Sequence, residues 1–176
     1  MVSNHHPEVI DNLNNGPAHK GTATIAKALA VPFPVKDVHF KPAAVNGNRA
    51  LAIAYVDARA IQERLDSVVG VDGWQDDYTC LPNGSVICHL RVRLGTEWIA
   101  KIDVGSPSAQ SDEGDRIKAA FSDALKRAAV KFGIGRYLYH LSGEWVEYDS
   151  KRRQFVQQPR LPSWAVPPEP TNGKPR

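Results

Sequence analysis

The segment 120–141, AFSDALKRAAVKFGIGRYLYHL, brings basic residues, a Gly-x-Gly pair and two tyrosines into one short stretch. Between Asp115 and Arg136, six basic residues accompany two acids, so this region alone carries more excess positive charge than the net +3 of the whole chain. Such a surplus is typical of surfaces that neutralise the phosphates of nucleic acid. A solvated helix face with basic residues near its C-terminus would account for the same charge. Charge alone therefore leaves both interpretations open.

The two glycines of this stretch raise the alternative of a nucleotide pocket. Phosphate-binding loops place their glycines before a helix, whose N-terminal amides then point at the anion. Gly133 and Gly135 instead follow the expected helix, where the partial charge of the helix end is negative. We therefore predict that Gly133 stops the helix at its C′ position and that the protein uses neither ATP nor another cofactor.

Acidic residues and a lysine on the expected strands offer a second chemistry, that of a metal-dependent nuclease. The residues concerned are Asp76, Asp77, Glu97, Lys101 and Asp103. The proline-aspartate partner that such sites place ahead of the glutamate and lysine is missing. An acidic loop at 112–115 is explained by capping of the helix that follows it, because acids favour a helix N-terminus. We expect these acids to be surface residues, and we predict no metal site and no enzymatic activity.

Length and composition favour a single globular domain. At 176 residues with a hydrophobic fraction of 42%, the chain can bury a sizeable core. Cys80 and Cys88 match no zinc or redox spacing, so we expect two reduced thiols. No apolar run approaches the length of a transmembrane helix, and the first residues lack the pattern of a secretory signal. We therefore expect a cytoplasmic protein without membrane contact.

Composition divides the chain into three parts. Residues 1–24 are rich in polar residues and residues 162–176 are rich in proline, so neither part is expected to bury much surface. Such ends are either mobile or docked by a few residues, such as Trp164. We predict a flexible N-terminal segment at 1–24, a folded domain at 25–161 and a proline-rich C-terminal tail at 162–176.

The first half of the domain is expected to form a hairpin followed by a helix. A short helical turn at Ile25–Leu29 ends before two prolines. Two apolar runs flank Asn46-Gly47, the strongest short signal of a β-hairpin, and Pro42 makes the first strand an edge strand or a bulged one. From residue 58 the apolar residues recur at helical spacing, with an aspartate at 57 as the N-cap and Gly70 as the stop.

Three strands and a long helix are expected to follow. Turn residues at 82–84 and 95–96 separate three strands between 74 and 105, and the alternation in the middle strand places His89, Arg91 and Arg93 on one face. A polar loop at 105–115 leads to a helix from about 115 to 132. The apolar stripe of that helix comprises Ile117, Phe121, Ala124, Leu125, Ala128 and Phe132. The stripe leaves Lys126 and Arg127 pointing outward. With an aromatic hairpin after residue 143, the fold class is α+β: an antiparallel β-sheet in the order β-β-α-β-β-β-α, packed on a long helix.

Two stretches carry a resemblance to a known family. The first stretch contains an expected helix followed by Gly-x-x-Gly-Trp, and it reads YVDARAIQERLDSVVGVDGW (55–74). The second places Ala-Leu-Lys-Arg-Ala ahead of Phe-Gly, and it reads DALKRAAVKFGIGRYLY (123–139). In this order and separation they resemble the annealing domain of the Rad52/Rad22 family, in particular its bacterial DNA-damage-response branch and its phage relatives. The resemblance spans about residues 25–161, nearly the whole expected domain.

The resemblance implies a ring of subunits whose outer groove holds single-stranded DNA with the backbone inward and the bases free to pair. It implies no nucleotide hydrolysis. Lys126 and Arg127 match the basic pair of the family's inner DNA site. The family's basic residue three positions beyond that pair is Val130 here, and Lys131 is one position further on. Arg59 lies next to the family's basic position near the start of the first helix.

Further arginines are candidates from their charge and their place on the expected elements. The full set of predicted DNA-binding residues is Lys126, Arg127, Lys131, Arg59, Arg91, Arg93 and Arg136. Tyr137 and Tyr139 could stack on bases. Aromatic residues that follow a helix are nevertheless more often part of the core, so both interpretations of the tyrosines stay open.

These observations lead to the hypothesis of a protein that binds single-stranded DNA and anneals complementary strands without ATP during recombination and double-strand break repair. Its phosphate contacts would be independent of sequence and would weaken with salt. The alternatives are a single-strand binder that protects DNA ends without annealing, the nuclease, and a purely structural or protein-interaction domain. The expected partners are single-stranded DNA, further copies of the chain in a ring, and a recombinase or a single-strand-binding protein.

Overall fold

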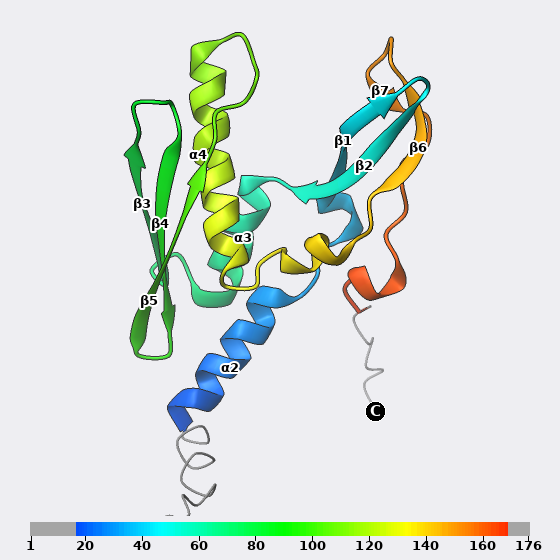
Figure 1. The fold of residues 1–176 in the computed structure, drawn as a ribbon. Coiled ribbons are helices and arrows are strands. Elements are labelled where there is room, and N and C mark those ends of the chain that lie inside the picture. Colours follow the sequence, from blue (N-terminus) through cyan, green and yellow to red (C-terminus); the bar gives the residue numbers. More distant parts are fainter. Residues whose placement is uncertain (1–16, 169–176) are drawn as a thin grey trace, which may run out of the picture.

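The computed structural model describes residues 17–168, which form an α+β fold as predicted (Figure 1). Its elements in chain order are α2 (Pro17–Ala30), β1 (Val38–Asn46), β2 (Arg49–Val56), α3 (Ala58–Val69), β3 (Trp74–Cys80), β4 (Val86–Leu94), β5 (Glu97–Gly105), α4 (Glu113–Val130), β6 (Glu144–Asp149) and β7 (Gln154–Phe155). Short 3₁₀ helices occupy Val35–Asp37, Arg136–His140 and Ser163–Ala165. The strands form two antiparallel sheets, one in the order β1-β2-β6-β7 and one in the order β3-β4-β5.

The first helix is longer than the sequence indicated. The prediction was a short turn at Ile25–Leu29, whereas α2 begins at Pro17 and ends at Ala30. A proline at the first helical position is well tolerated because its missing N–H has no partner there in any helix. The prolines at 32 and 34 end the helix, as predicted. Among residues 17–168, neither this helix nor another is long and apolar enough to cross a membrane.

A contact from another helix stabilises the C-terminal end of α2. The guanidinium of Arg64, in α3, donates hydrogen bonds to the carbonyl oxygens of Leu29 at 3.2 Å and of Val31. The same group lies 4.3 Å from the centre of the Phe33 ring. The last carbonyl groups of a helix have no partner within the helix. Arg64 supplies the hydrogen-bond donors that these carbonyls of α2 need. Burial lowers the pKa of Arg64, with the charges of Tyr137 and Asp37 acting in the opposite direction.

The β1–β2 hairpin forms as predicted around Asn46-Gly47. Gly47 has φ of 60°, and the register of the two strands shifts between Pro42 and Ala44. β1 is the edge strand of its sheet, so the missing N–H of Pro42 interrupts no central ladder. β6 pairs with the other side of β2, and the side chain of Arg49 donates to the carbonyl of Trp145 across that pair.

The three-stranded sheet is covered on one face by α4, as Figure 1 shows. The inward side chains of β4 are almost completely buried, and they are Val86, Cys88, Leu90 and Val92. They face the small residues of α4, among which Ala120, Ala124 and Ala128 are also fully buried. Cys88 is a free thiol, as is the exposed Cys80. Ile117 was expected in the apolar stripe but is 42% exposed, because the buried stripe of α4 begins one turn later, at Ala120.

The helix stop at Gly133 is confirmed. Gly133 N donates to Val130 O at 2.9 Å, and Ile134 N donates to Ala129 O at 3.3 Å. These are the two hydrogen bonds of a Schellman motif, which places a left-handed residue at C′. Gly133 has φ of 96°, a conformation that side chains with a Cβ rarely adopt. Gly133 therefore terminates the helix at its negative end, as the sequence predicted, and Gly135 precedes the 3₁₀ helix at Arg136–His140.

Candidate nucleic-acid interface

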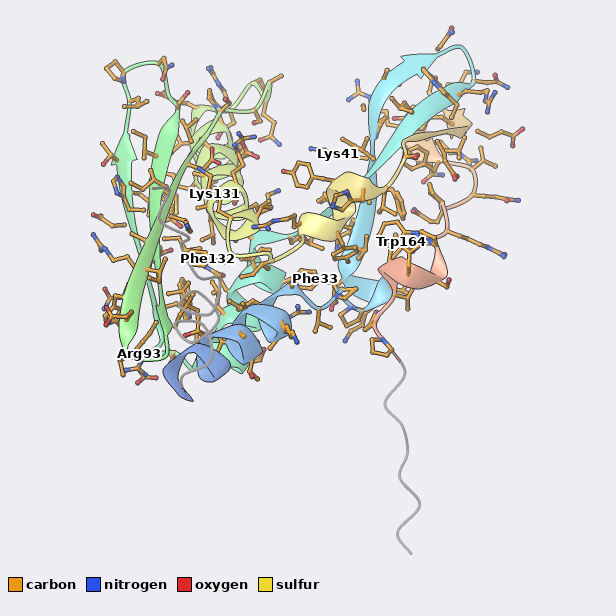
Figure 2. The ribbon with its side chains drawn as sticks, turned by 60° about the horizontal axis from the view of Figure 1, so that its bottom comes forward. Phe33, Lys41, Arg93, Lys131, Phe132 and Trp164 are labelled. Atoms are coloured by element: carbon orange, nitrogen blue, oxygen red, sulfur yellow. The ribbon has the colours of Figure 1, made fainter. Side chains whose placement is uncertain are left out.

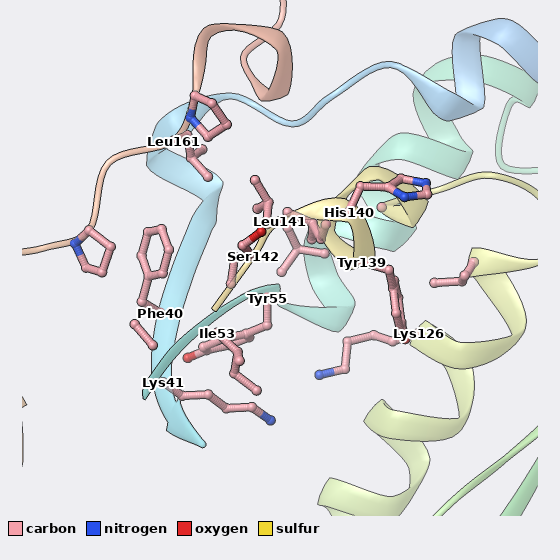
Figure 3. Close-up of a pocket in the computed structure, with 18 of the residues that line it drawn as sticks. Phe40, Lys41, Ile53, Tyr55, Lys126, Tyr139, His140, Leu141, Ser142 and Leu161 are labelled. Carbon is pink, nitrogen blue, oxygen red and sulfur yellow. The ribbon is translucent and has the colours of Figure 1, made fainter. Parts of the chain in front are cut away.

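A cavity of about 850 Å³ opens between the four-stranded sheet and the C-terminal half of α4 (Figure 3). β1 and β2 form one wall, α4 forms another, and the segments 134–144 and 159–164 close it. Its charged side chains are mainly cationic: Lys41, Lys126, Arg127 and Arg160 line it together with two acids, Asp123 and Glu144. A cavity of this charge favours an anionic occupant.

Two lysines converge on one tyrosine inside this cavity. Lys41 Nζ, from β1, lies 5.6 Å from the centre of the Tyr55 ring, and Lys126 Nζ, from α4, lies 5.7 Å from it. Figure 3 shows both ammonium groups reaching into the same space. Cation–π attraction offsets part of the repulsion between them. An anion that enters this space would contact both ammonium groups.

Burial makes the charge of Lys126 costly in the free protein. Desolvation lowers the pKa of Lys126, and the nearby charge of Lys41 lowers it further, while Asp123 and Asp57 act in the opposite direction. Among residues 17–168, Lys126 forms no ion pair. A phosphate in the cavity would favour the charged form that burial disfavours. The electrostatics of the site therefore favour a bound phosphate.

Arg127 points to a different partner from its neighbour. Arg127 Nε lies 3.1 Å from Asp103 Oδ1, and Lys131 Nζ lies 3.1 Å from Asp103 Oδ2. The hydrogen bond that Arg127 donates to Asp103 raises the pKa of Arg127, and desolvation partly offsets this effect. The expectation that Lys126 and Arg127 both point outward is therefore wrong for Lys126. Tyr55, a residue of the other sheet, lies against that side of α4 and leaves Lys126 half-buried.

The other predicted arginines lie outside the cavity. Arg59 is exposed on the first turn of α3, and Arg91 is exposed on the face of β4 that points away from α4. Arg93 shares that face, pairs with Asp72 at 3.2 Å and lies at the lower end of the three-stranded sheet in Figure 2, far from Lys41. The structure thus brings Lys126 and Arg127 to one cavity but leaves the strand arginines apart from it.

Arg136 and Lys131 lie around a second, smaller cavity. It has a volume of about 300 Å³, and Lys101 also lines it. Arg136 Nε donates to Val130 O at 2.9 Å, which ties this side chain to the end of α4. Lys131 is thus near both the Asp103 pair and this second cavity, whereas Arg136 lines only the second one.

The two tyrosines have different environments. Tyr137 is half-buried, its hydroxyl accepts a hydrogen bond from Phe33 N at 3.0 Å, and burial raises its pKa. Tyr139 is 69% exposed and lines the large cavity beside Lys126 (Figure 3). Tyr137 therefore belongs to the core, whereas Tyr139 has an accessible ring that could stack on a base.

Comparison with known proteins agrees with the resemblance seen in the sequence. The sequence profile of the Rad52/22 family of double-strand break repair proteins matches residues 21–156. The chain belongs to the Rad52/22 family. It is 42% identical over 147 residues to the single-stranded DNA-binding protein DdrA of Deinococcus deserti, an alignment that covers 81% of this chain and 70% of that protein. It is 43% identical over 147 residues to the protein of the same name in Deinococcus radiodurans, covering 81% of this chain and 68% of that protein.

Sequence reasoning missed two parts of the cavity in this Rad52/22 chain. Lys41 lies on a strand far from α4 in sequence, and no local pattern pairs it with Lys126. Arg160 and Trp164 line the cavity from the C-terminal side, and Ala165 beside them is fully buried. Packed chain therefore continues beyond Leu161, the predicted end of the domain. Docking by Trp164 was one of the two alternatives that the sequence left open for this end, but the sequence did not indicate that it would line the cavity.

The acids of the nuclease alternative do not converge in the Rad52/22 fold. Asp76 accepts a hydrogen bond from the Tyr78 hydroxyl at 2.8 Å, and Asp103 is held by two cations. Asp76 and Lys101 both lie opposite Leu90, on different sides of β4. Among residues 17–168, there is no group of three or more His, Cys, Asp or Glu side chains that could hold a metal ion.

Proposed function

We propose that this Rad52/22 protein binds single-stranded DNA and anneals complementary strands without ATP in recombination and double-strand break repair. The observation that carries the proposal is the pair of lysines on Tyr55 in a cationic cavity, Lys41 and Lys126. The named relatives are single-stranded DNA-binding proteins, which supports the same ligand.

The chemistry of the cavity suits a binder that does not read sequence. Ammonium and guanidinium groups contact phosphate oxygens, which are identical at every nucleotide. Such contacts hold the backbone and leave the base edges free, which is the condition for pairing with a second strand. They also place two strands within reach of each other despite their mutual repulsion, and this raises the local concentration for annealing.

We further propose that several copies of the chain assemble into a ring. The net charge of +3 is modest for a DNA-binding protein, and a ring would repeat the cationic cavity along one strand. The outer face of the three-stranded sheet supports an additional interface, because Trp98, Ile102 and Val104 are between 41% and 47% exposed there. A recombinase or a single-strand-binding protein is the further partner that we propose.

The direct test is a titration of a fluorescent single-stranded oligonucleotide at several salt concentrations, followed by annealing of two bare complementary oligonucleotides without ATP. We expect tight binding, with the logarithm of the binding constant falling linearly with the logarithm of the salt concentration. We also expect faster annealing than without protein, and a molecular mass above that of one chain. Binding without faster annealing would favour the end-protecting alternative. Absence of binding at low salt would refute the proposal, and magnesium-dependent cleavage would support the nuclease.

Tyr139 provides a prediction about the bases. Replacing its accessible ring by Tyr139→Ala is expected to weaken single-strand binding about tenfold, since a stacked base contributes roughly 1–3 kcal/mol. Tyr139→Phe keeps the ring and should bind like the wild type. The measurement is the dissociation constant of a short oligonucleotide at one moderate salt concentration. Equal affinity of the alanine variant and the wild type would exclude stacking on Tyr139.

A further inference from the structure

We propose that Asp103 is an internal competitor for DNA phosphate, which holds Arg127 and Lys131 until a strand displaces it. This inference rests on the proposed function, because it concerns how the same protein binds its single strand. It assigns to Asp103 the role of a positioning residue that limits affinity. Two classes of cation follow: Lys41 and Lys126, which are open to an anion, and Arg127 and Lys131, which are held.

The geometry of Asp103 resembles that of a bound phosphate. Its two carboxylate oxygens each accept from one cation at 3.1 Å, Oδ1 from Arg127 Nε and Oδ2 from Lys131 Nζ. Val104 N also donates to Oδ1 at 2.8 Å, and Lys131 donates in addition to the Ile102 carbonyl. A carboxylate presents anionic oxygens to the same two side chains that a phosphate would use.

The exposure of the three side chains shows which of them a strand could reach. The side chain of Asp103 is only 16% exposed, whereas those of Arg127 and Lys131 are 47% and 45% exposed. The cations therefore cover the carboxylate and face the solvent themselves. Arg127 also lines the large cavity, so it lies between Asp103 and the proposed DNA site. A phosphate can approach both cations from outside without entering the core.

The energetics allow an exchange of partners. Ion pairs near the surface contribute little net stability and are weakened by salt, so a strand with several phosphates can compete with one carboxylate. Burial raises the pKa of Asp103, but hydrogen bonds from Val104, Lys131 and Arg127 outweigh it, and the net pKa is lowered. The carboxylate thus stays negatively charged and keeps both cations engaged. It competes with the entering phosphate for them and is expected to lower the affinity for DNA.

The test is Asp103→Asn, measured as the dissociation constant of a fluorescent single-stranded oligonucleotide over a range of salt. The amide keeps the shape and can still accept from Val104 N, but it has no charge to hold the cations. We expect binding to become about tenfold tighter at moderate salt, because Arg127 and Lys131 are released from the carboxylate and can contact phosphates of the strand. The salt dependence is expected to steepen by about 0.7 for each cation gained by the strand. Asp103→Ser serves as a second variant if the amide perturbs folding, which thermal unfolding would reveal.

Three comparisons make the result specific. Asp115→Asn removes the same charge from the pair with Lys118, near the other end of α4, and should change affinity less than twofold. Asp103→Glu restores the charge and should restore weaker binding. In a background with Arg127→Ala and Lys131→Ala, Asp103→Asn should give no tightening, because the cations that it releases are gone.

Two outcomes separate this inference from the proposed function. A wild-type protein that fails to bind single strands would overturn both. Salt-dependent binding by the wild type, with Asp103→Asn binding equally or more weakly, would overturn only the competitor role and make Asp103 a support for Arg127. Tightening that persists without Arg127 and Lys131 would also overturn it, since the effect would then be general electrostatics.

Discussion

Replacing Lys126 by alanine is expected to weaken single-strand binding by about ten- to a hundredfold, with an unchanged fold. A hydrogen bond between a charged group and phosphate contributes about 1.5–3 kcal/mol, and tenfold in affinity corresponds to about 1.4 kcal/mol. Lys126 should be at the upper end because its ammonium is half-buried, has no ion pair in the described chain and shares Tyr55 with Lys41. Fluorescence anisotropy with a short oligonucleotide measures the change.

Matched variants separate the charge from the packing of this side chain. Lys126→Met keeps an aliphatic stem beside Tyr55 without the ammonium, and it should bind as weakly as Lys126→Ala. Lys118→Ala removes an equal charge from an exposed position earlier in α4 and should have little effect. Arg127→Ala should cost less affinity than Lys126→Ala, because Arg127 must first leave Asp103. Wild-type affinity of both Lys126 variants would remove this residue from the site.

Replacing Gly105 by alanine is expected to destabilise the fold by about 3 kcal/mol or more, the cost of severe overpacking. Gly105 is buried at the end of β5, directly against α4. A Cβ there would overlap the Ala120 carbonyl oxygen and the Ala124 amide nitrogen, which are main-chain atoms of a helix. Unlike a flexible side chain, this backbone can make room only if the whole helix moves away from the sheet. Urea unfolding followed by circular dichroism measures the loss.

A glycine in open space provides the control for this prediction. Gly21 lies in α2, where an added Cβ would meet no heavy atom within 4 Å. Gly21→Ala should leave stability unchanged or raise it by up to about 1 kcal/mol, because alanine favours a helix more than glycine does. A Gly105→Ala protein as stable as the wild type would show that α4 can shift on the sheet. The close approach in the structure would then have no energetic importance.

Local sequence patterns were sufficient for the fold class and for several of its boundaries. The Asn46-Gly47 turn, the alternation along β4 and the stop at Gly133 each depend on residues that are neighbours in the chain. Turn geometry and the periods of strands and helices are local properties, so the sequence expresses them directly. The N-terminal turns of α2, from Pro17 to Thr24, were missed because they contain no large apolar residue that would mark a helical period.

The arrangement of the basic residues depended on contacts between distant parts of the chain. Lys126 and Arg127 are adjacent and read as one outward pair, yet Lys126 reaches Tyr55 on one sheet and Arg127 reaches Asp103 on the other. Helical periodicity gives the angle between two side chains, but it does not specify what lies beside each of them. The packing of the two sheets around α4 decided which charge is buried, which is held by an acid and which is open to an anion.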